Sequence, residues 1–146
     1  MPIHATSSSW IIETNQTGYA IGLNNAGLLT HRYWRERLPQ PSDYPPAPNP
    51  VERASFDMPA HYTPEEYPGY SALRYIDPAI KITFADGVRD LVPEYVDYSV
   101  SDGLYPELSI HLRDAYYPVK LTLHYRAYEK YDLISRWVTM QRLCGW

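Results

Sequence analysis

The residues that could do chemistry are spread thinly along this chain. Only His111 and His124 fall on two candidate strands that could pair, both at outward positions, where solvated histidines are more common than metal ligands. The histidines as a group show no paired metal-binding spacing, and they are His4, His31, His61, His111 and His124. We therefore expect neither a metal site nor a cofactor.

The carboxylates indicate no catalytic pair either. Glu65 and Glu66 are adjacent in a loop, where solvation is favoured over a catalytic role. A glycosidase needs two carboxylates on either side of the scissile bond, and the sequence nominates no such pair. The remaining aspartates of interest lie in predicted turns, where aspartate caps its own backbone: Asp86, Asp102, Asp114 and Asp132. We assign no catalytic residue.

Composition excludes several classes of protein. The length of 146 residues suits one domain or part of a larger one. A net charge of -4 offers no basic face to nucleic acid, and no apolar run is long enough to span a bilayer. The start, MPIHATSSSWIIET, lacks the features of a signal peptide, so a cytoplasmic location is expected. Cys144 stands alone, which excludes an internal disulfide and a cysteine-based zinc cluster.

The tyrosine and proline contents are unusual. There are 15 tyrosines against 2 phenylalanines, and 14 prolines against 7 glycines. Tyrosine favours strands and half-wet surfaces, where the ring packs and the hydroxyl stays hydrated. Sugar-binding faces have this composition, but ordinary β-proteins share it and are the favoured interpretation.

A hairpin is predicted near the start of the chain. Thr17–Leu23 alternates, the Asn24–Gly27 segment has turn residues, and Leu28–Trp34 returns. In the returning strand, strict alternation would place one set of side chains on one face, namely Leu28, Thr30, Arg32 and Trp34, and the other set on the opposite face, namely Leu29, His31 and Tyr33.

A proline-rich loop is predicted next, over residues 38–68. It contains nine of the 14 prolines, which remove hydrogen-bond donors from sheets and break helices. Loops longer than about 12–15 residues are usually functional or disordered. Its aromatic residues favour docking onto another surface: Tyr44, Phe56, Tyr62, Tyr67 and the nearby Tyr70.

Strand patterns resume in the second half. Ala79–Val92 alternates around Asp86-Gly87, a strong hairpin turn. Val119–Tyr128 alternates most clearly, and a polar turn and the start of another strand follow it up to Met140. Further strands are predicted at Glu94–Gly103 and Leu108–Arg113. No segment has a sustained helical period, so the fold class is all-β, antiparallel and sandwich-like.

Three stretches together resemble one family. YWRERLPQPSDY (Tyr33–Tyr44), EEYPGYSALRYIDPAIKI (Glu65–Ile82) and VKLTLHYRAYEKYDLISRWVTM (Val119–Met140) are similar, in order and spacing, to segments of the N-terminal domain of glycoside hydrolase family 36, the α-galactosidases. Each motif is weak alone, but three in order are fairly specific. The resemblance extends from about Trp10 to Met140.

The resemblance implies a fold and a parent enzyme. Residues 1–146 would be the N-terminal β-sandwich segment, the first part of a β-supersandwich, with further strands and a (β/α)₈ barrel following in the parent. The barrel would carry the catalytic aspartates, one of them in a Lys-Trp-Asp motif that this chain lacks. The parent would hydrolyse terminal non-reducing α-D-galactose residues, as in melibiose or raffinose.

Two departures from the family pattern stand out. Leu73-Arg74-Tyr75-Ile76 replaces the family's Gly-Asp-Phe-Arg, so its aspartate and arginine are missing. The tail, Gln141–Trp146, does not continue the family pattern, which suggests a frameshift, a wrongly placed exon end or a real truncation.

The resemblance also implies two substrate-binding residues. In tetrameric members an N-terminal loop reaches a neighbouring subunit's active site, and Asp43 best matches the loop aspartate that contacts galactose. A carboxylate accepts hydrogen bonds from adjacent sugar hydroxyls. The alternative is that Asp43 only caps a turn. Arg53 is a weaker candidate for holding this loop.

Two other interpretations remain open. The chain could be a free-standing carbohydrate-binding β-domain, which its tyrosines and 4 tryptophans favour. It could also be an inactive remnant. Because an incomplete sandwich leaves strand edges and an apolar face open, we expect the isolated chain to self-associate or to be poorly soluble.

Overall fold

The chain folds into two facing antiparallel sheets of four strands each. The computed structural model describes residues 2–71 and 74–144. In each sheet the strands lie in sequence order, so each sheet is a meander. The first sheet contains β1 (Ile3–Ala5), β2 (Ser9–Glu13), β3 (Thr17–Leu23) and β4 (Leu29–Glu36), and the second contains β5 (Pro93–Ser101), β6 (Glu107–Asp114), β7 (Val119–Tyr128) and β8 (Leu133–Arg142). The predicted all-β, antiparallel sandwich is confirmed.

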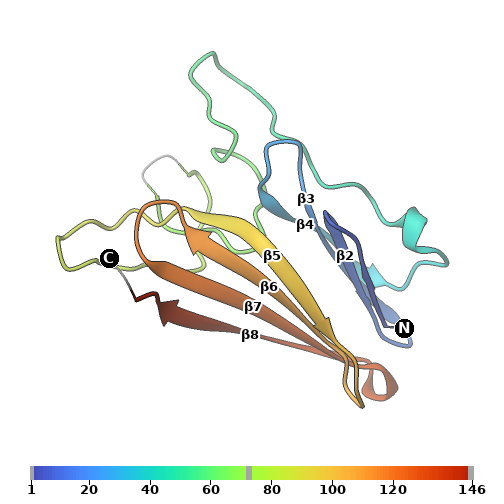
Figure 1. The fold of residues 1–146 in the computed structure, drawn as a ribbon. Coiled ribbons are helices and arrows are strands. Elements are labelled where there is room, and N and C mark those ends of the chain that lie inside the picture. The colour runs from blue at the N-terminus through green and yellow to red at the C-terminus, as the bar shows by residue number, and fades with distance from the viewer. Residues whose placement is uncertain (1, 72–73, 145–146) are drawn as a thin grey trace.

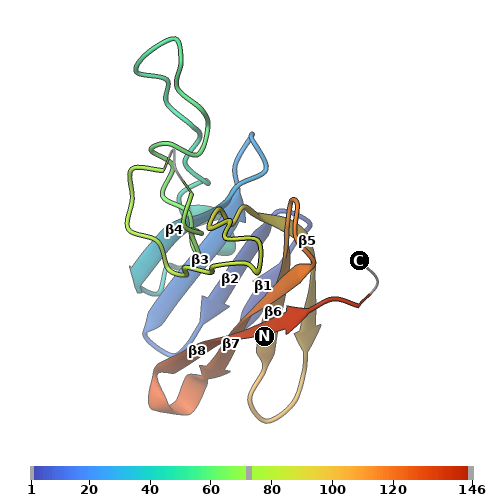
Figure 2. The ribbon, with the colours of Figure 1, turned by 90° about the vertical axis from the view of Figure 1, so that its left-hand side faces the viewer.

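The two sheets stack face to face (Figure 1). Trp10 of β2 packs on Tyr95 and Tyr98 of β5, and Tyr19 of β3 packs on Tyr125 of β7. In Figure 2, β4 and β8 lie along the same side of the sandwich. That side therefore presents two edge strands, one from each sheet.

The core lies between the sheets and follows the predicted alternation. On β7, buried and half-buried residues alternate along all 10 positions. Because successive side chains of a strand point to opposite faces, one set enters the core, namely Val119, Leu121, Leu123, Tyr125 and Ala127. β6 contributes Leu108, Ile110 and Leu112 to the same cluster.

The predicted hairpin of the first sheet is confirmed as β3 and β4. The Asn24 side chain accepts hydrogen bonds from the amides of Ala26 and Leu28, each at 3.0 Å. Gly27 has a φ of 76°, a left-handed conformation that suits glycine.

The predicted facing of Trp34 is wrong because a β-bulge interrupts β4. Ile21 pairs with His31, whereas Ala20 pairs with Tyr33, so Arg32 is the extra residue. An extra residue reverses the alternation beyond it. Trp34 therefore lies opposite Tyr19 on the side facing the second sheet, instead of sharing a face with Arg32.

The strands predicted within Ala79–Val92 do not form. The turn at Asp86-Gly87 is present, with a φ of 87° at Gly87, but the arms beyond it do not pair as a ladder. Their amides go to another segment: Ala79 donates to the Pro68 carbonyl and Leu91 to that of Tyr70. The alternation has a different cause, because one side of this extended segment packs half-buried against the core through Ile80, Ile82 and Phe84.

The proline-rich loop is a long excursion from the first sheet. Over residues 38–68 it contains one short helix, η1 (Pro41–Asp43), and one isolated bridge between Glu65 and Thr30. Figure 1 shows it passing beyond the end of the β3–β4 hairpin. The end of the loop is held against β4 by two backbone hydrogen bonds. The His31 amide donates to the Pro64 carbonyl at 3.0 Å, and the Glu66 amide donates to the Leu29 carbonyl at 2.8 Å.

The last predicted hairpin is also present. β7 and β8 are joined through η2 (Glu129–Tyr131), and Gln141 and Arg142 continue β8 rather than leaving the sheet. Three positions singled out in the sequence, Leu73 and residues 145 and 146, lie outside the described residues. Nowhere in the described ranges is there a helix long and apolar enough to cross a membrane.

Candidate functional site

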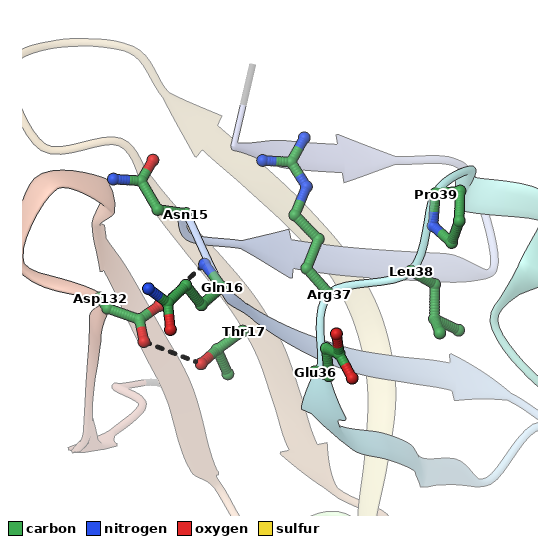
Figure 3. Close-up of a pocket in the computed structure, with 8 residues that line it drawn as sticks. All are labelled: Asn15, Gln16, Thr17, Glu36, Arg37, Leu38, Pro39 and Asp132. Atoms are coloured by element: carbon green, nitrogen blue, oxygen red, sulfur yellow. Dashed lines mark hydrogen bonds between the residues drawn. The ribbon is translucent and has the colours of Figure 1, made fainter.

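A polar pocket of about 580 Å³ lies where three connections meet. Figure 3 shows its lining side chains, which come from the β2–β3 turn, from the end of β4 with the residues after it, and from the β7–β8 connection. They are Asn15, Gln16, Thr17, Glu36, Arg37, Leu38, Pro39 and Asp132. The pocket thus joins the two sheets to the start of the proline-rich loop.

Asp132 is the central residue of this pocket. Its φ is 52°, in the left-handed region where aspartate is one of the few tolerated residues. Its carboxylate accepts hydrogen bonds from the Thr14 hydroxyl, from the Gln16 amide at 3.1 Å and from the Thr17 hydroxyl at 3.4 Å. The hydrogen bond from Thr14, followed by those from the other two, lowers the pKa of Asp132 below its usual value. Sequence reasoning expected a local cap, but Asp132 instead ties the second sheet to the first.

A buried carboxylate, Glu66, connects the proline-rich loop to both sheets. It accepts hydrogen bonds from the hydroxyls of Tyr19 on β3 and Tyr125 on β7, the second at 2.8 Å. His31 lies 3.2 Å and Arg136 3.5 Å from its oxygens. We call these five residues the Glu66 cluster. Burial and the charge of Glu66 raise the pKa of both tyrosines, so their hydroxyls remain donors.

The sequence interpretation of Glu65 and Glu66 as a solvated pair is wrong. Glu66 is 7% exposed. The side chain of Glu65 is also buried, with 5% of its surface exposed, and its carboxylate accepts hydrogen bonds from the Arg74 guanidinium at 2.7 and 3.2 Å. Burying a carboxylate is costly unless it is paired, and each of the two has found its own partners.

A second cleft of about 340 Å³ opens beside the Glu66 cluster, between β4 and β8. Trp34 stands at its wall with 67% of its surface exposed, although it is on the side of β4 that faces the second sheet. The other lining residues are Thr17, Tyr19, Tyr125, Asp132, Leu133, Ile134 and Arg136. The cleft is therefore aromatic and polar, and open on the side where both sheets end.

Asp43 lies in η1 at the start of the proline-rich loop. Its carboxylate accepts a hydrogen bond from the Gln40 amide at 3.0 Å, so it does cap a turn, and it remains exposed. The next residue, Tyr44, is buried and donates to Glu13 at 2.9 Å. Burial raises the pKa of Tyr44 to about 12. Tyr44 thus anchors the loop and leaves Asp43 at the surface.

Arg53 lies farther along the loop and stabilises a local turn. Its amide donates to Asp57 at 2.7 Å, and its guanidinium carbon is 4.6 Å from the centre of the Tyr62 ring. No hydrogen bond or ion pair between described residues joins Arg53 to Asp43. The geometry therefore does not bring the two candidate substrate-binding residues together.

The carboxylates that line the two pockets are Glu36 and Asp132, and that of Asp132 is engaged by Thr14, Gln16 and Thr17. The buried carboxylates Glu13, Glu65 and Glu66 line neither pocket, and each is engaged by cations or hydroxyls. Within residues 2–71 and 74–144, no three side chains of histidine, cysteine, aspartate or glutamate are grouped to hold a metal ion. His111 binds the Thr122 hydroxyl at 3.1 Å instead. The two pockets can therefore bind polar molecules.

The Glu66 cluster was missed by sequence reasoning, although Glu66 lies inside one of the quoted motifs. Its partners are separated from it by 35 to 70 positions, and periodicity within one strand says nothing about them. The one local sign of this cluster was Glu66 itself, a carboxylate directly before Tyr67-Pro68 in the quoted motif.

Comparison with known proteins gives a consistent result. The family model described as "Glycosyl hydrolase family 36 N-terminal domain" matches residues 27–143. Comparison with the curated proteins gives no match.

Several solved structures share the fold. The α-galactosidase AgaB from Geobacillus stearothermophilus has a TM-score of 0.79 and 22% identity, over 97% of this chain and 22% of that one. The galactosidase domain of the α-galactosidase–sucrose kinase AgaSK has a TM-score of 0.81 and 22% identity, over 96% of this chain and 23% of that one. A variant of AgaA from G. stearothermophilus in complex with raffinose has a TM-score of 0.76 and 20% identity, over 92% of this chain and 22% of that one. This chain thus spans less than a quarter of these structures.

Proposed function

We propose that this chain is the non-catalytic β-sandwich of an α-galactosidase, because it belongs to the N-terminal domain family of glycosyl hydrolase family 36. The parent enzyme hydrolyses terminal non-reducing α-D-galactose residues of substrates such as melibiose and raffinose. The domain supports the fold of the parent, its subunit contacts and its substrate entrance.

One observation carries the supporting role: the sandwich is open between β4 and β8. Trp34 is 67% exposed there, although it lies on the inner face of its sheet. Farther along the inner face of β8, Met140 is 59% exposed beside Ile82 and Phe84. Ile134 and Val138 beside them are only half-buried. Exposed apolar groups arranged in this way mark a surface that another element covers. We propose that the rest of the parent enzyme covers it.

The subunit contact is proposed for the proline-rich loop. Four apolar side chains in or beside it project into solvent, namely Val51 (69% exposed), Phe56 (77%), Met58 (57%) and Tyr75 (61%). Aromatic residues and methionine are enriched in protein interfaces. We propose that these side chains pack on a neighbouring subunit of a homo-oligomer, a tetramer by resemblance. Asp43 then contacts galactose in that subunit's active site.

The test uses the full-length parent enzyme and its hydrolysis of raffinose. Asp43→Asn should raise KM about tenfold or more, since a hydrogen bond to a charged group contributes about 1.5–3 kcal/mol. Glu52→Gln is the matched control, because Glu52 is also an exposed carboxylate of the loop. It should leave KM unchanged.

Two outcomes would count against the proposal. If Asp43→Asn has the KM of the wild type, Asp43 only caps its turn and the trans contact is wrong. If the full-length parent hydrolyses no α-galactoside, the enzymatic assignment itself fails.

A further inference from the structure

The outer face of the second sheet carries an ordered set of polar side chains. The register of β5 to β8 aligns them in three rows of four residues, one residue per strand. The rows are Ser101, Glu107, Arg126 and Ser135; Ser99, Ser109, His124 and Trp137; and Asp97, His111, Thr122 and Thr139. We call this set the outer-face grid. Its only apolar member is Trp137.

The polar members of the grid hold one another in place. Glu107 accepts hydrogen bonds from Arg126 at 2.8 and 3.2 Å, and it lies 3.2 Å from Nδ1 of His124. Nε2 of His124 is 2.9 Å from the Thr139 hydroxyl. Partial burial of Glu107 raises its pKa, but the hydrogen bonds from Arg126 and His124 outweigh this and lower it. The grid is thus preorganised, and the charges of Glu107 and Arg126 are already paired with each other.

Trp137 lies at the margin of this network, and its ring is held by its neighbours on β7. The His124 imidazole stacks on it, with 4.9 Å between ring centroids and 6° between planes. The Arg126 guanidinium carbon is 5.0 Å from its centroid. The residue is nevertheless 38% exposed. A fixed, partly exposed aromatic surface therefore adjoins a field of hydroxyl, imidazole, guanidinium and carboxylate groups.

We propose that the outer-face grid binds a neutral oligosaccharide, which packs the apolar face of one sugar ring on Trp137 and hydrogen-bonds to the neighbouring rows. Aromatic rings with a few convergent polar groups suit such a ligand. Strand spacing of about 4.8 Å and a two-residue repeat of about 6.8 Å give a face of roughly 14 by 13 Å, enough for several sugar units.

The chemistry of the grid argues against other ligands. Protein interfaces have apolar cores, whereas the grid has no aliphatic side chain. Nucleic acids and acidic glycans need unpaired cations, but Arg126, the one arginine or lysine within the three rows, is paired with Glu107, and Arg113 and Lys120 lie outside the grid in the next row. This binding is separate from the proposed support of a catalytic domain and does not require hydrolysis.

The test is a titration of the 146-residue chain with raffinose and stachyose, followed by NMR of the tryptophan indole N–H resonances. We expect the Trp137 resonance to shift. Trp137→Ala should weaken binding about threefold to tenfold, as expected for loss of one stacked ring. Trp34→Ala is the matched control, because Trp34 is also exposed but lies in the cleft between β4 and β8. Its affinity should equal that of the wild type.

Three results would overturn the proposal. They are a shift of the Trp34 resonance in place of Trp137, no shift with either sugar up to its solubility, and tighter binding of dextran sulfate than of the neutral sugars. Sequential assignment of the wild-type spectrum identifies the shifted indole even if Trp137→Ala does not fold.

Discussion

Replacing Glu66 by alanine should destabilise the domain severely. The change leaves the hydroxyls of Tyr19 and Tyr125 buried without their acceptor, and each unsatisfied buried group costs about 1–3 kcal/mol. The two costs sum to about 2–6 kcal/mol, but the desolvation penalty of the carboxylate is relieved at the same time, so we expect a net loss in the lower half of that range, about 3 kcal/mol. That is a large part of the 5–15 kcal/mol by which domains are typically stable.

Urea unfolding followed by far-ultraviolet circular dichroism measures this loss. Glu66→Gln, which keeps one carbonyl oxygen for the hydroxyls, should cost only about 1–2 kcal/mol. Tyr125→Phe is the partner variant for a double-mutant cycle. Once Glu66 is replaced by alanine, the Tyr125 hydroxyl is buried without an acceptor, so removing it should no longer destabilise the domain. The two changes in the free energy of unfolding should therefore not add.

Two results would refute this reasoning. One is a free energy of unfolding for Glu66→Ala within 0.5 kcal/mol of the wild type, taking about 0.5 kcal/mol as the usual bound for a neutral surface change. The other is strict additivity with Tyr125→Phe. Either would mean that the carboxylate does not bridge the sheets in solution.

Three further predictions concern the contacts that hold the sheets and the loop together. The pKa of Asp132 in the folded state is lowered from its ordinary value of 3.8. The stability that Asp132 contributes should therefore be complete above pH 3.8 and should disappear as the pH falls through the folded-state pKa. Thermal unfolding measured between about pH 2 and 7 should show a weaker loss of stability in acid for Asp132→Asn than for the wild type. Tyr44→Phe should cost about 1–3 kcal/mol, since it removes the hydroxyl that anchors the proline-rich loop, and limited proteolysis should cut that loop faster; equal cutting rates would contradict the anchoring role. Gly69→Ala should lower the thermal midpoint, because a Cβ there would collide with the Leu91 carbonyl oxygen, at a cost of about 1–3 kcal/mol; Gly103→Ala, with nothing within 4 Å of its Cβ, is the neutral control.

The fold was predictable wherever local pattern and local structure have the same cause. The alternation of Val119–Tyr128 reports a strand with one face in a core, and that is what β7 is. The alternation of Ala79–Val92 looks the same but arises from an extended segment lying on the core. Periodicity shows that one side of a segment is buried, but it does not show which groups accept hydrogen bonds from its backbone amides. A strand and an extended segment lying on the core could therefore not be distinguished from the sequence.

The candidate site was predictable only in part, because its contacts are remote in sequence. Asp132 could be placed in a turn, but its partner Thr14 is 118 positions away. The extra residue at Arg32 left no signal in the sequence, yet it turns Trp34 into the cleft. Asp43 and Arg53 were named through a family resemblance, and the geometry shows a capping role for the first and a local turn for the second.

The four edge strands of this sandwich, β1, β4, β5 and β8, differ in how well their free edges are protected from pairing with another chain. β1 has only three residues, β5 begins with Pro93 and has an irregular register near Tyr95, and Glu65 bridges the exposed edge of β4 at Thr30. Only β8, with ten residues, offers a long regular edge among the described strands. Two copies joined through β8 would each use up that edge, so the contact is self-complementary and closes as a pair. Association of the isolated 146-residue chain through its sheet edges should therefore stop at a dimer and not extend into fibres, as it could if β4 were equally free.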